Sequence, residues 1–210
     1  MDRALPSLYF LWLKLLEVED GFILQTRCLD AGEQSIEFQQ PPGGASTIIP
    51  MLLCVLTVSD RCSQGLMTDT AGPAVADLLR QHWPGSRVAN ALVPDKEDEI
   101  IARLLEWSSM HASLILTVGG TGLSPRDRTP EATVRILDRL VPGIAEAMRA
   151  IGSAKNQFAW LSRGIAGLRG STLIVNLPGS KRGAEESLSA VIPLLNHAIE
   201  VAGGGQNHPS

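Results

Sequence analysis

The chain has few of the residues that build cross-linked or zinc-stabilised proteins. Its 210 residues include three cysteines and four histidines, and no two cysteines stand in a CxxC arrangement. Disulfide frameworks and structural zinc sites need such residues in paired spacings. The composition therefore predicts a reducing compartment and no structural zinc. Cys54 lies within an apolar run, so we expect its thiol to be a small core group.

The chain also lacks an excess of basic residues and a membrane-spanning run. Asp and Glu number 22 against 18 Lys and Arg, for a formal net charge of −4, whereas proteins that bind nucleic acid or membrane surfaces usually carry a basic excess. The stretch LPSLYFLWLKLL near the N-terminus is broken by Lys14, is too short to span a membrane and has no convincing small-residue cleavage site. We expect a cytoplasmic protein with no nucleic-acid or membrane partner.

Residues 1–49 differ in character from the rest. An apolar segment is followed by the polar stretch DAGEQSIEFQQ and by PPGGAST, which has a linker composition. Met51 stands directly before the first strong strand signal, so two alternatives stay open: residues 1–49 are an appendage, structured or not, or translation naturally starts at Met51. We expect one domain over residues 50–204 and a tail over residues 205–210.

Apolar runs of strand length alternate with helical periodicity from residue 51 onward. Strands are predicted at 52–58, 87–93, 113–118 and 171–177. Helices are predicted from a cap at Asp69 or Thr70 to the HWPGS stop, then over 99–107, 130–140 (capped by Thr129), 143–151 and 184–201, with 159–170 as a glycine-punctuated connection. Continuously apolar strands joined by helices predict a doubly wound α/β fold, a mostly parallel sheet with helices on both faces.

Loops that follow parallel strands share one edge of the sheet, where ligands bind in such folds. Gly119, Gly120 and Gly122 follow the third predicted strand. They would let the backbone present N–H groups to an anion, or they would only relieve strain in a strand-to-helix turn. The spacing matches neither GxxxxGK[ST] nor GxGxxG, so neither a P-loop nor a dinucleotide site is supported.

Carboxylates lie on the same predicted edge. Asp95 follows the second strand and Asp127, between Arg126 and Arg128, follows the third. Two carboxylates beside a bound polyphosphate suit a hard cation such as Mg²⁺. The alternatives are a turn residue for Asp95 and, for Asp127, a solvated carboxylate or a partner of the next helix.

Polar side chains at the tips of the first and last strands are further candidates for orienting a ligand. Ser59 and Asp60 end the first strand, and Asn176 ends the last. For each of these three residues a simple cap or turn role is the alternative.

Seven spaced motifs lie within the segment 51–203: LTVSDRCSQG, DTAG, VPD, LILTVGGTGLSPRD, TPEAT, LSRGIAGLRG and NLPGS. Together they resemble the molybdopterin adenylyltransferases, the family that includes the bacterial enzyme and the G domains of the plant protein and of gephyrin. The resemblance implies a homotrimer that transfers AMP from Mg·ATP to the terminal phosphate of molybdopterin, releasing pyrophosphate. It implies Mg²⁺, ATP and molybdopterin as ligands, and a separate molybdenum insertase as a partner.

Site residues are carried over by position. The resemblance implies that Asp95 and Asp127 are the functional aspartates, which we expect to position Mg²⁺ and the nucleotide without abstracting a proton. Expected substrate-binding residues are Ser59, Asp60, Asp69, Gly119, Gly120, Thr121, Gly122, Ser162, Asn176, Pro178, Gly179 and Ser180. Arg61, Arg126 and Lys181 either counter phosphate charge or are solvated surface residues.

The chain departs from the family pattern at Ser113, Arg128, Lys181 and the pair Asn156–Gln157, and none of these changes removes a proposed metal or phosphate ligand. Two other functions remain as alternatives. One is a pterin-binding or scaffolding member that has lost catalysis, which retention of Asp95, Asp127 and GGTG disfavours. The other is the related molybdenum insertase, for which the chain is too short to carry the additional domains.

Overall fold

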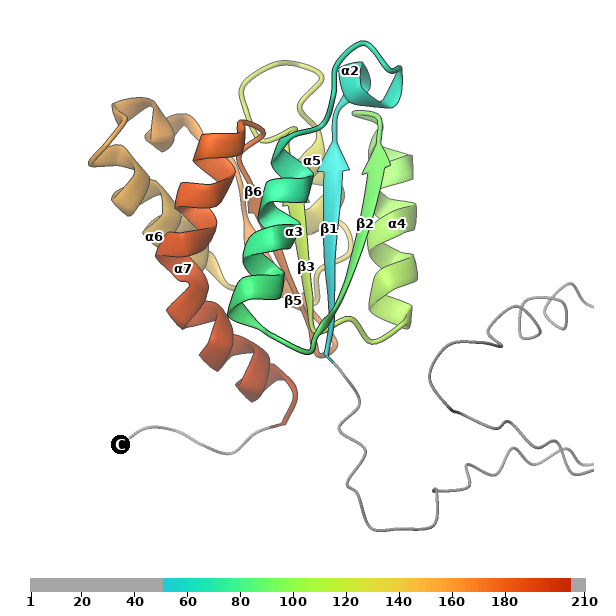
Figure 1. Ribbon diagram of the computed structural model, residues 1–210, viewed down its shortest axis with the longest axis vertical. Helices are drawn as coiled ribbons and strands as arrows, with labels where there is room; N and C mark the ends of the chain where they lie inside the picture. Colours follow the sequence, from blue (N-terminus) through green and yellow to red (C-terminus); the bar gives the residue numbers. More distant parts are fainter. Residues whose placement is uncertain (1–50, 205–210) are drawn as a thin grey trace, which may run out of the picture. The chain divides into compact units, whose positions relative to one another are not determined.

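The computed structural model describes residues 51–204, which form one six-stranded sheet in the order β2-β1-β3-β6-β5-β4 (Figure 1). The strands are β1 (Leu52–Val58), β2 (Arg87–Val93), β3 (Leu114–Val118), β4 (Arg139–Leu140), β5 (Ala166–Arg169) and β6 (Thr172–Leu177). The first four in the spatial order are mutually parallel, and β5 and β4 are added antiparallel. The predicted mostly parallel sheet is confirmed.

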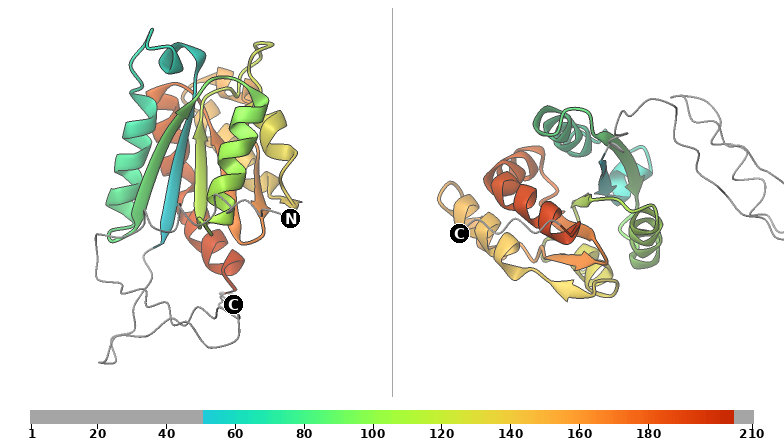
Figure 2. Two further views of the ribbon diagram at one scale, coloured as in Figure 1. Left: turned by 90° about the vertical axis from the view of Figure 1, so that its right-hand side faces the viewer. Right: turned by 90° about the horizontal axis from the view of Figure 1, so that it is seen from below.

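Helices cover both faces of this sheet (Figure 2). They are α2 (Asp60–Ser63), α3 (Ala71–His82), α4 (Glu97–Ser109), α5 (Thr129–Val134), α6 (Pro142–Ser153), the 3₁₀ helix η2 (Gln157–Leu161) and α7 (Lys181–Ala202). Buried residues of α3, α6 and α7 share one apolar cluster with the sheet, and those of α4 and α5 share the other. The doubly wound prediction is therefore confirmed.

Alternation along β1 shows how the strands serve both clusters. Leu53 and Val55 belong to the cluster under α3 and α7, whereas Cys54 and Leu56 belong to the cluster under α4. All four are completely buried, which confirms Cys54 as a core residue. Burial, aided by the Glu106 charge, raises the pKa of the Cys54 thiol to about 12, so this thiol is a neutral packing group at ordinary pH.

Three sequence predictions are wrong in detail. The helix predicted over 130–140 ends at Val134, because the chain then turns to pair β4 with β5 through bonds such as Asp138 N–H to Leu168 O. The connection predicted over 159–170 contains the end of η2 and the whole of β5. Thr129 is not the cap of α5: Arg128 occupies that position, and the Thr129 hydroxyl donates to Gly119 O at 2.9 Å.

Two differences concern helix starts. The short helix α2 was not predicted, and α7 starts at Lys181, three residues before the predicted start, because the Ser180 side chain caps it by accepting from Gly183 N–H. The predictions for residues 1–49 and for the tail fall outside the described residues. Across residues 51–204, no helix combines the length and apolar character needed to cross a membrane.

The order of the strands creates a crevice at one edge of the sheet. The chain leaves β1 toward α3 on one face and leaves the neighbouring β3 toward α5 on the opposite face. Loops that diverge in this way leave a gap between them at the carboxyl ends of the strands, the usual ligand position in doubly wound sheets. The fold thus places the loops after β1 and β3 at the same end of the sheet (Figure 1).

Candidate functional site

A pocket of about 770 Å³ occupies this edge, lined by the loops that follow β1, β2, β3 and β6. Nine of the residues selected from the sequence line it: Ser59, Asp60, Asp69, Asp95, Gly119, Gly120, Asp127, Gly179 and Ser180. The candidate cations Arg61, Arg126 and Lys181 line it as well. Residues as far apart in the chain as Ser59 and Lys181 are therefore brought together, as expected for the loops of a parallel sheet.

The remaining candidates lie elsewhere. Ser162, Asn176 and Pro178 line a separate cavity of about 40 Å³ beside α6. Thr121 and Gly122 line neither of these two cavities. Thr121 is instead buried, and its carbonyl accepts from Arg163 N–H at 3.0 Å. The residues predicted to share one ligand-binding edge are thus divided: nine line the large pocket, three line the small cavity, and Thr121 and Gly122 line neither.

Asp60 and Asp95 hold each other through reciprocal hydrogen bonds. Asp60 N–H donates to Asp95 Oδ2 at 2.7 Å, and Asp95 N–H donates to Asp60 Oδ1 at 3.0 Å. These bonds tie the loop after β2 to the first turn of α2. The turn-residue alternative for Asp95 is therefore partly right, since one of its carboxylate oxygens has a structural partner.

Burial and neighbouring charges shift the pKa of Asp95. Burial raises the pKa of Asp95, the charges of Asp60 and Asp127 raise it further, and the Asp60 N–H and the Arg126 charge oppose the shift. Ionisation of a carboxyl group in this setting is unfavourable, because the charge is partly desolvated and is repelled by the neighbouring carboxylates. A cation bound between the carboxylates would relieve both.

Gly119 and Gly120 have backbone conformations that other residues rarely adopt. Their φ angles are +107° and +63°. A Cβ atom on Gly120 would lie 2.2 Å from Thr129 Oγ1, and one on Gly119 would lie 2.4 Å from Val58 O. Glycine is thus sterically required here, as the turn alternative holds, and the same conformation leaves the backbone open toward the pocket.

The loops after β3 and β6 meet backbone to backbone. A Cβ atom on Gly179 would lie 3.1 Å from the Gly119 Cα, closer than ordinary van der Waals contact. Gly119 N–H also donates to Leu177 O at 3.2 Å. The two glycine-containing loops therefore form one continuous wall of the pocket.

Asp127 is fixed within its own loop. Its Oδ2 accepts from Ser124 N–H, and its N–H donates to Ser124 O, both at 2.9 Å. The helix-cap alternative for Asp127 is wrong, because Arg128 is the N-cap residue of α5 and no side chain bonds there. Its carboxylate instead borders the pocket.

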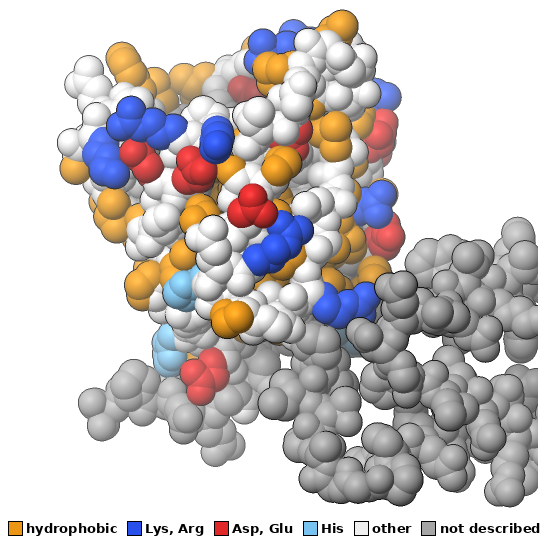
Figure 3. Space-filling view, in the orientation of Figure 1, with side chains coloured by type: hydrophobic (Ala, Val, Ile, Leu, Met, Phe, Trp, Pro, Cys, Tyr) orange, Lys and Arg blue, Asp and Glu red, His pale blue; other side chains and the backbone are white. Residues whose placement is uncertain are grey.

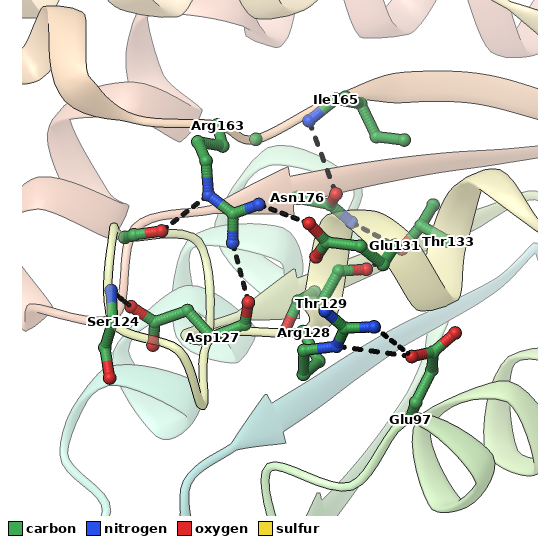
Figure 4. Close-up of polar contacts among 12 residues, drawn as sticks. Glu97, Ser124, Asp127, Arg128, Thr129, Glu131, Thr133, Arg163, Ile165 and Asn176 are labelled. Atoms are coloured by element: carbon green, nitrogen blue, oxygen red, sulfur yellow. Dashed lines mark hydrogen bonds and ion pairs between the residues drawn. The ribbon is translucent and has the colours of Figure 1, made fainter.

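The two arginines beside Asp127 point in different directions. Arg126 lines the pocket, is 79% exposed and contacts Asp60 Oδ2 at 3.4 Å. Arg128 turns away and pairs with Glu97 at 2.9 Å (Figure 4). Arg135 pairs with the same carboxylate. Arg128, where the chain departs from the family pattern, thus forms an ion pair that joins the start of α5 to α4.

Other polar candidates also have structural partners. Asp69 Oδ1 accepts from Ala71 and Gly72 N–H, each at 3.0 Å, and its Oδ2 accepts from the Thr57 hydroxyl at 2.6 Å. Asp69 therefore satisfies the start of α3, where Thr70 makes no side-chain cap bond. Ser59 caps α2 by accepting from Cys62 N–H at 3.3 Å. Both residues combine a cap with a position on the pocket wall.

Asn176 joins four parts of the structure. Its Nδ2 donates to Thr117 Oγ1 at 2.9 Å and to Thr133 Oγ1 at 3.0 Å, and its Oδ1 accepts from Ile165 N–H at 3.3 Å (Figure 4). The side chain is 1% exposed. Its three hydrogen bonds link β6, β3, α5 and the segment before β5.

Sequence reasoning missed Arg163. Its guanidinium donates to Gly122 O and to Asp127 O, both at 2.6 Å, and pairs with Glu131 (Figure 4). The only available signal was its place directly after Ser162 in the LSR motif. Contacts across more than 30 residues leave no local pattern.

Charges of both signs are mixed on the visible surface. In the space-filling view, Lys and Arg side chains lie at the upper end, where the pocket loops are, together with Asp and Glu side chains (Figure 3). Within residues 51–204, no group of three or more Asp, Glu, His or Cys side chains is arranged to hold a metal alone. A cation would need ligands from a substrate as well.

Comparisons with known proteins give a consistent result. Residues 54–197 match the family model described as "Probable molybdopterin binding domain". The molybdenum cofactor synthesis protein cinnamon of Drosophila melanogaster is 39% identical over 150 residues, 71% of this chain and 25% of that protein. Molybdopterin adenylyltransferase of Helicobacter pylori is 35% identical over 149 residues, 70% of this chain and 85% of that protein.

The solved structure of the molybdopterin biosynthesis enzyme MoaB from Thermus thermophilus is 48% identical, with a TM-score of 0.67, and the match covers 73% of this chain and 97% of that one. The chain thus spans a quarter of cinnamon but most of these bacterial relatives. The matched segment contains every loop that lines the pocket. This chain belongs to the molybdopterin-binding domain family of molybdenum cofactor biosynthesis.

Proposed function

We propose that this protein transfers AMP from ATP to the terminal phosphate of molybdopterin. The observation that carries the proposal is the pocket at the edge of the sheet, where the Gly119–Gly120 backbone, four carboxylates and three basic side chains meet. Such a site suits two phosphate-bearing substrates. The adenylyltransferase of Helicobacter pylori, with 85% of its length matched, supports the same activity.

The reaction needs alignment more than proton transfer. A phosphate oxygen of molybdopterin attacks the α-phosphorus of ATP, the new P–O bond forms, and the bond to pyrophosphate breaks. Because the attacking phosphate is already ionised near neutral pH, no general base is required. The protein must hold two anions close together and stabilise the charge on the departing pyrophosphate.

The donor set fits Mg²⁺ as an ion shared between protein and nucleotide. Asp95 and Asp127 each have one oxygen bonded to a backbone N–H, and within residues 51–204 their Oδ1 atoms have no hydrogen-bond donor. Mg²⁺ usually binds one or two carboxylates and takes its other ligands from phosphates and water. Asp95 and Asp127 would hold the ion, which would neutralise phosphate charge when bound.

The basic residues supply fixed charge for the same purpose. Arg61, Arg126 and Lys181 border the pocket from the loops after β1, β3 and β6. Lys181 is the first residue of α7, where the Ser180 side chain caps the helix. We propose that these side chains attract the phosphates of the two substrates, and the helix start adds partial positive charge beside them.

The test is a direct assay of purified protein with Mg·ATP and molybdopterin, with adenylylated product measured. We expect Asp127→Asn to lower kcat/KM by about 100-fold, since one fixed charge in the site is lost. Asp77→Asn on the exposed surface of α3 is the matched control and should leave the rate unchanged. Wild-type turnover no greater than that of Asp127→Asn would overturn the proposal.

The assembly and the cellular setting are part of the proposal. We propose a homotrimer in the cytoplasm that passes adenylylated molybdopterin to a separate molybdenum insertase. Cinnamon, of which the match covers 25%, is long enough to hold further domains in one chain. Sedimentation equilibrium of the purified protein tests the trimer, and a monomer across micromolar concentrations would contradict it.

A scaffolding role without catalysis is the second candidate. It would require the pocket to bind molybdopterin without positioning a nucleotide. The two oxygens available on Asp95 and Asp127 favour the enzyme, because a pair of carboxylates suits a cation that is shared with nucleotide phosphates. Molybdopterin binding with no Mg·ATP binding in calorimetry would favour the scaffold.

A further inference from the structure

Arg163 connects the glycine loop to the rest of the molecule. The loop (residues 119–128) runs from the end of β3 to the start of α5. Arg163 lies between η2 and β5, and its side chain is 34% exposed. Its three donor groups reach Gly122 O, Asp127 O and the Glu131 carboxylate.

Few other bonds hold the middle of this loop. Between Thr121 and Asp127, the described hydrogen bonds to other parts of the chain are those to Arg163 and the exposed contact of Arg126 with Asp60. Arg163 supplies three of them, since its backbone N–H also donates to Thr121 O. Asp127 is bonded to Ser124 within the loop, and its bond to the rest of the chain is the one that its carbonyl accepts from Arg163.

Arg163 is itself held in place from two sides. Arg149 of α6 donates to Ser162 O at 3.4 Å and to Gly164 O at 3.0 Å, the two residues that flank it. The next residue, Ile165, donates its N–H to the buried Asn176 of β6. The arginine therefore extends from a segment fixed to α6 and to the sheet.

Glu131 orients the guanidinium. Burial raises the pKa of Glu131, but hydrogen bonding and the charge of Arg163 outweigh it, so that the pKa lies below its ordinary value. The other carboxylate oxygen, Oε2, is buried and has no hydrogen-bond partner within residues 51–204. A carboxylate that accepts a hydrogen bond from one arginine fixes the orientation of that arginine's planar guanidinium group.

We propose that Arg163 is a positioning residue, oriented by Glu131, that keeps the glycine loop and Asp127 in the conformation that receives the nucleotide phosphates. The inference rests on the proposed function for the identity of the ligand. Arg163 acts through the loop backbone and does not itself line the pocket. A lysine keeps the charge but lacks the fork that reaches two carbonyl groups and a carboxylate at once.

The positioning role predicts a particular kinetic pattern. If Arg163→Lys lets the loop leave its competent conformation about 90% of the time, the apparent Kd for Mg·ATP rises about tenfold. Saturating nucleotide restores the bound conformation, so kcat stays within about twofold of wild type. Hydrogen exchange of the amides at 121–127 should become faster in the free variant.

The experiment compares Arg163→Lys, Glu131→Gln, the double variant and Arg169→Lys. Arg169 is the matched control: it lies on β5 and donates to Ile136 O at 2.8 Å, away from the glycine loop. Mg·ATP affinity is measured by calorimetry, kcat and KM by the adenylylation assay, and loop exchange by mass spectrometry. We expect the double variant to be little worse than Arg163→Lys, because the two side chains act as one unit.

Different outcomes bear on different claims. Unchanged exchange at 121–127 in Arg163→Lys overturns the positioning role, whether or not the wild type forms product. A lower kcat with unchanged nucleotide affinity overturns it as well, since that pattern belongs to a group acting on the reacting atoms. A wild type that makes no product while the variant shows faster loop exchange overturns only the proposed function.

Discussion

At the scale of single residues, several pocket side chains have two tasks. Asp95 and Asp69 each satisfy backbone N–H groups and also border the pocket, and the Ser180 hydroxyl caps α7 at the same wall. The reason is geometric, since the carboxyl end of a parallel sheet is also where helices begin and need caps. Removing such a side chain therefore affects both folding and ligand binding.

Gly120→Ala tests whether Mg·ATP binding requires the backbone conformation of the glycine loop. In Gly120→Ala the new Cβ would meet Thr129 Oγ1 at 2.2 Å and Asp95 Oδ1 at 3.2 Å. We expect weaker binding of Mg·ATP, by about tenfold or more, because the loop must shift by several tenths of an ångström or further. Calorimetry on the folded variant measures the effect.

Gly85→Ala is the control for backbone strain alone. Gly85 also has a positive φ, +86°, but a Cβ there would meet nothing within 4 Å. It should lower the free energy of unfolding by about 1–2 kcal/mol and leave nucleotide affinity as it is. Equal affinities for the two variants would leave Gly120 with a purely conformational role.

Asp95 gives the protein a specific pH dependence. Because burial and the Asp60 and Asp127 charges raise its pKa in the folded state, the folded protein holds this proton more tightly than the unfolded chain does. The free energy of unfolding should therefore fall as pH rises from the ordinary value of 3.8 through the raised pKa. Asp95→Asn should lack this contribution, as chemical denaturation across the acid range would show.

Mg·ATP should offset, at neutral pH, the loss of stability that ionisation of Asp95 causes in the folded protein. A cation beside Asp95 favours the ionised carboxylate, so the ligand should stabilise the wild type more than Asp95→Asn. Thermal melts with and without Mg·ATP make the comparison. An equal shift in Tm for both proteins would contradict a cation ligand role for Asp95.

At the scale of elements, the buried parallel strands were predictable and the antiparallel ones were not. The LLCVLTV and STLIVNL runs carry continuous apolar signals because both faces of β1 and β6 are covered. The strand β4 is only Arg139–Leu140, both exposed, and β5 is AGLR, with a glycine in place of an apolar side chain. Their structure comes from pairing, of β5 with β6 and of β4 with β5, rather than from local preference.

The candidate site was likewise predictable where it is built from the ends of parallel strands, and not predictable elsewhere. Strand tips such as Ser59, Asp95 and Gly119 could be placed on one edge, because the positions of parallel strand ends follow from the fold. The position of Arg163 could not, since its partners depend on how the segment before β5 packs on α6. Asn176 was selected from the sequence, but it lines the small cavity beside α6 rather than the large pocket, and its amide group bonds Thr117 and Thr133.

Asn176→Ala tests how much the hydrogen bonds between β6, β3 and α5 stabilise the fold. Asn176→Ala leaves Ile165 N–H without its acceptor and the Thr117 and Thr133 hydroxyls without their donor. Leaving such buried groups unpaired costs about 1–3 kcal/mol each, so we expect the free energy of unfolding to fall by about 2 kcal/mol or more. Urea denaturation measures it.

Asn90→Ala provides the comparison, because Asn90 is an exposed residue in the middle of β2. It should change the free energy of unfolding by less than about 0.5 kcal/mol. If the two variants were equally stable, the hydrogen bonds of Asn176 would have no net structural value.

At the scale of the whole molecule, the described residues that line the pocket lie between Thr57 and Lys181. We therefore expect deletion of residues 1–49 to leave kcat/KM for Mg·ATP within about twofold of the full chain. The adenylylation assay on both proteins makes the comparison. A large loss of activity would give the N-terminal segment a working role.

The place of β6 in the sheet sets the order in which the chain can assemble. Although β6 is the last strand in the sequence, it lies between β3 and β5, and Leu114 of β3 pairs with Leu173 of β6. β4 and β5 leave the ribosome earlier but have no partner in the main sheet until β6 arrives. During synthesis the edge of β3 therefore stays open until about residue 177, a long interval in which an unpaired strand edge is exposed to other chains.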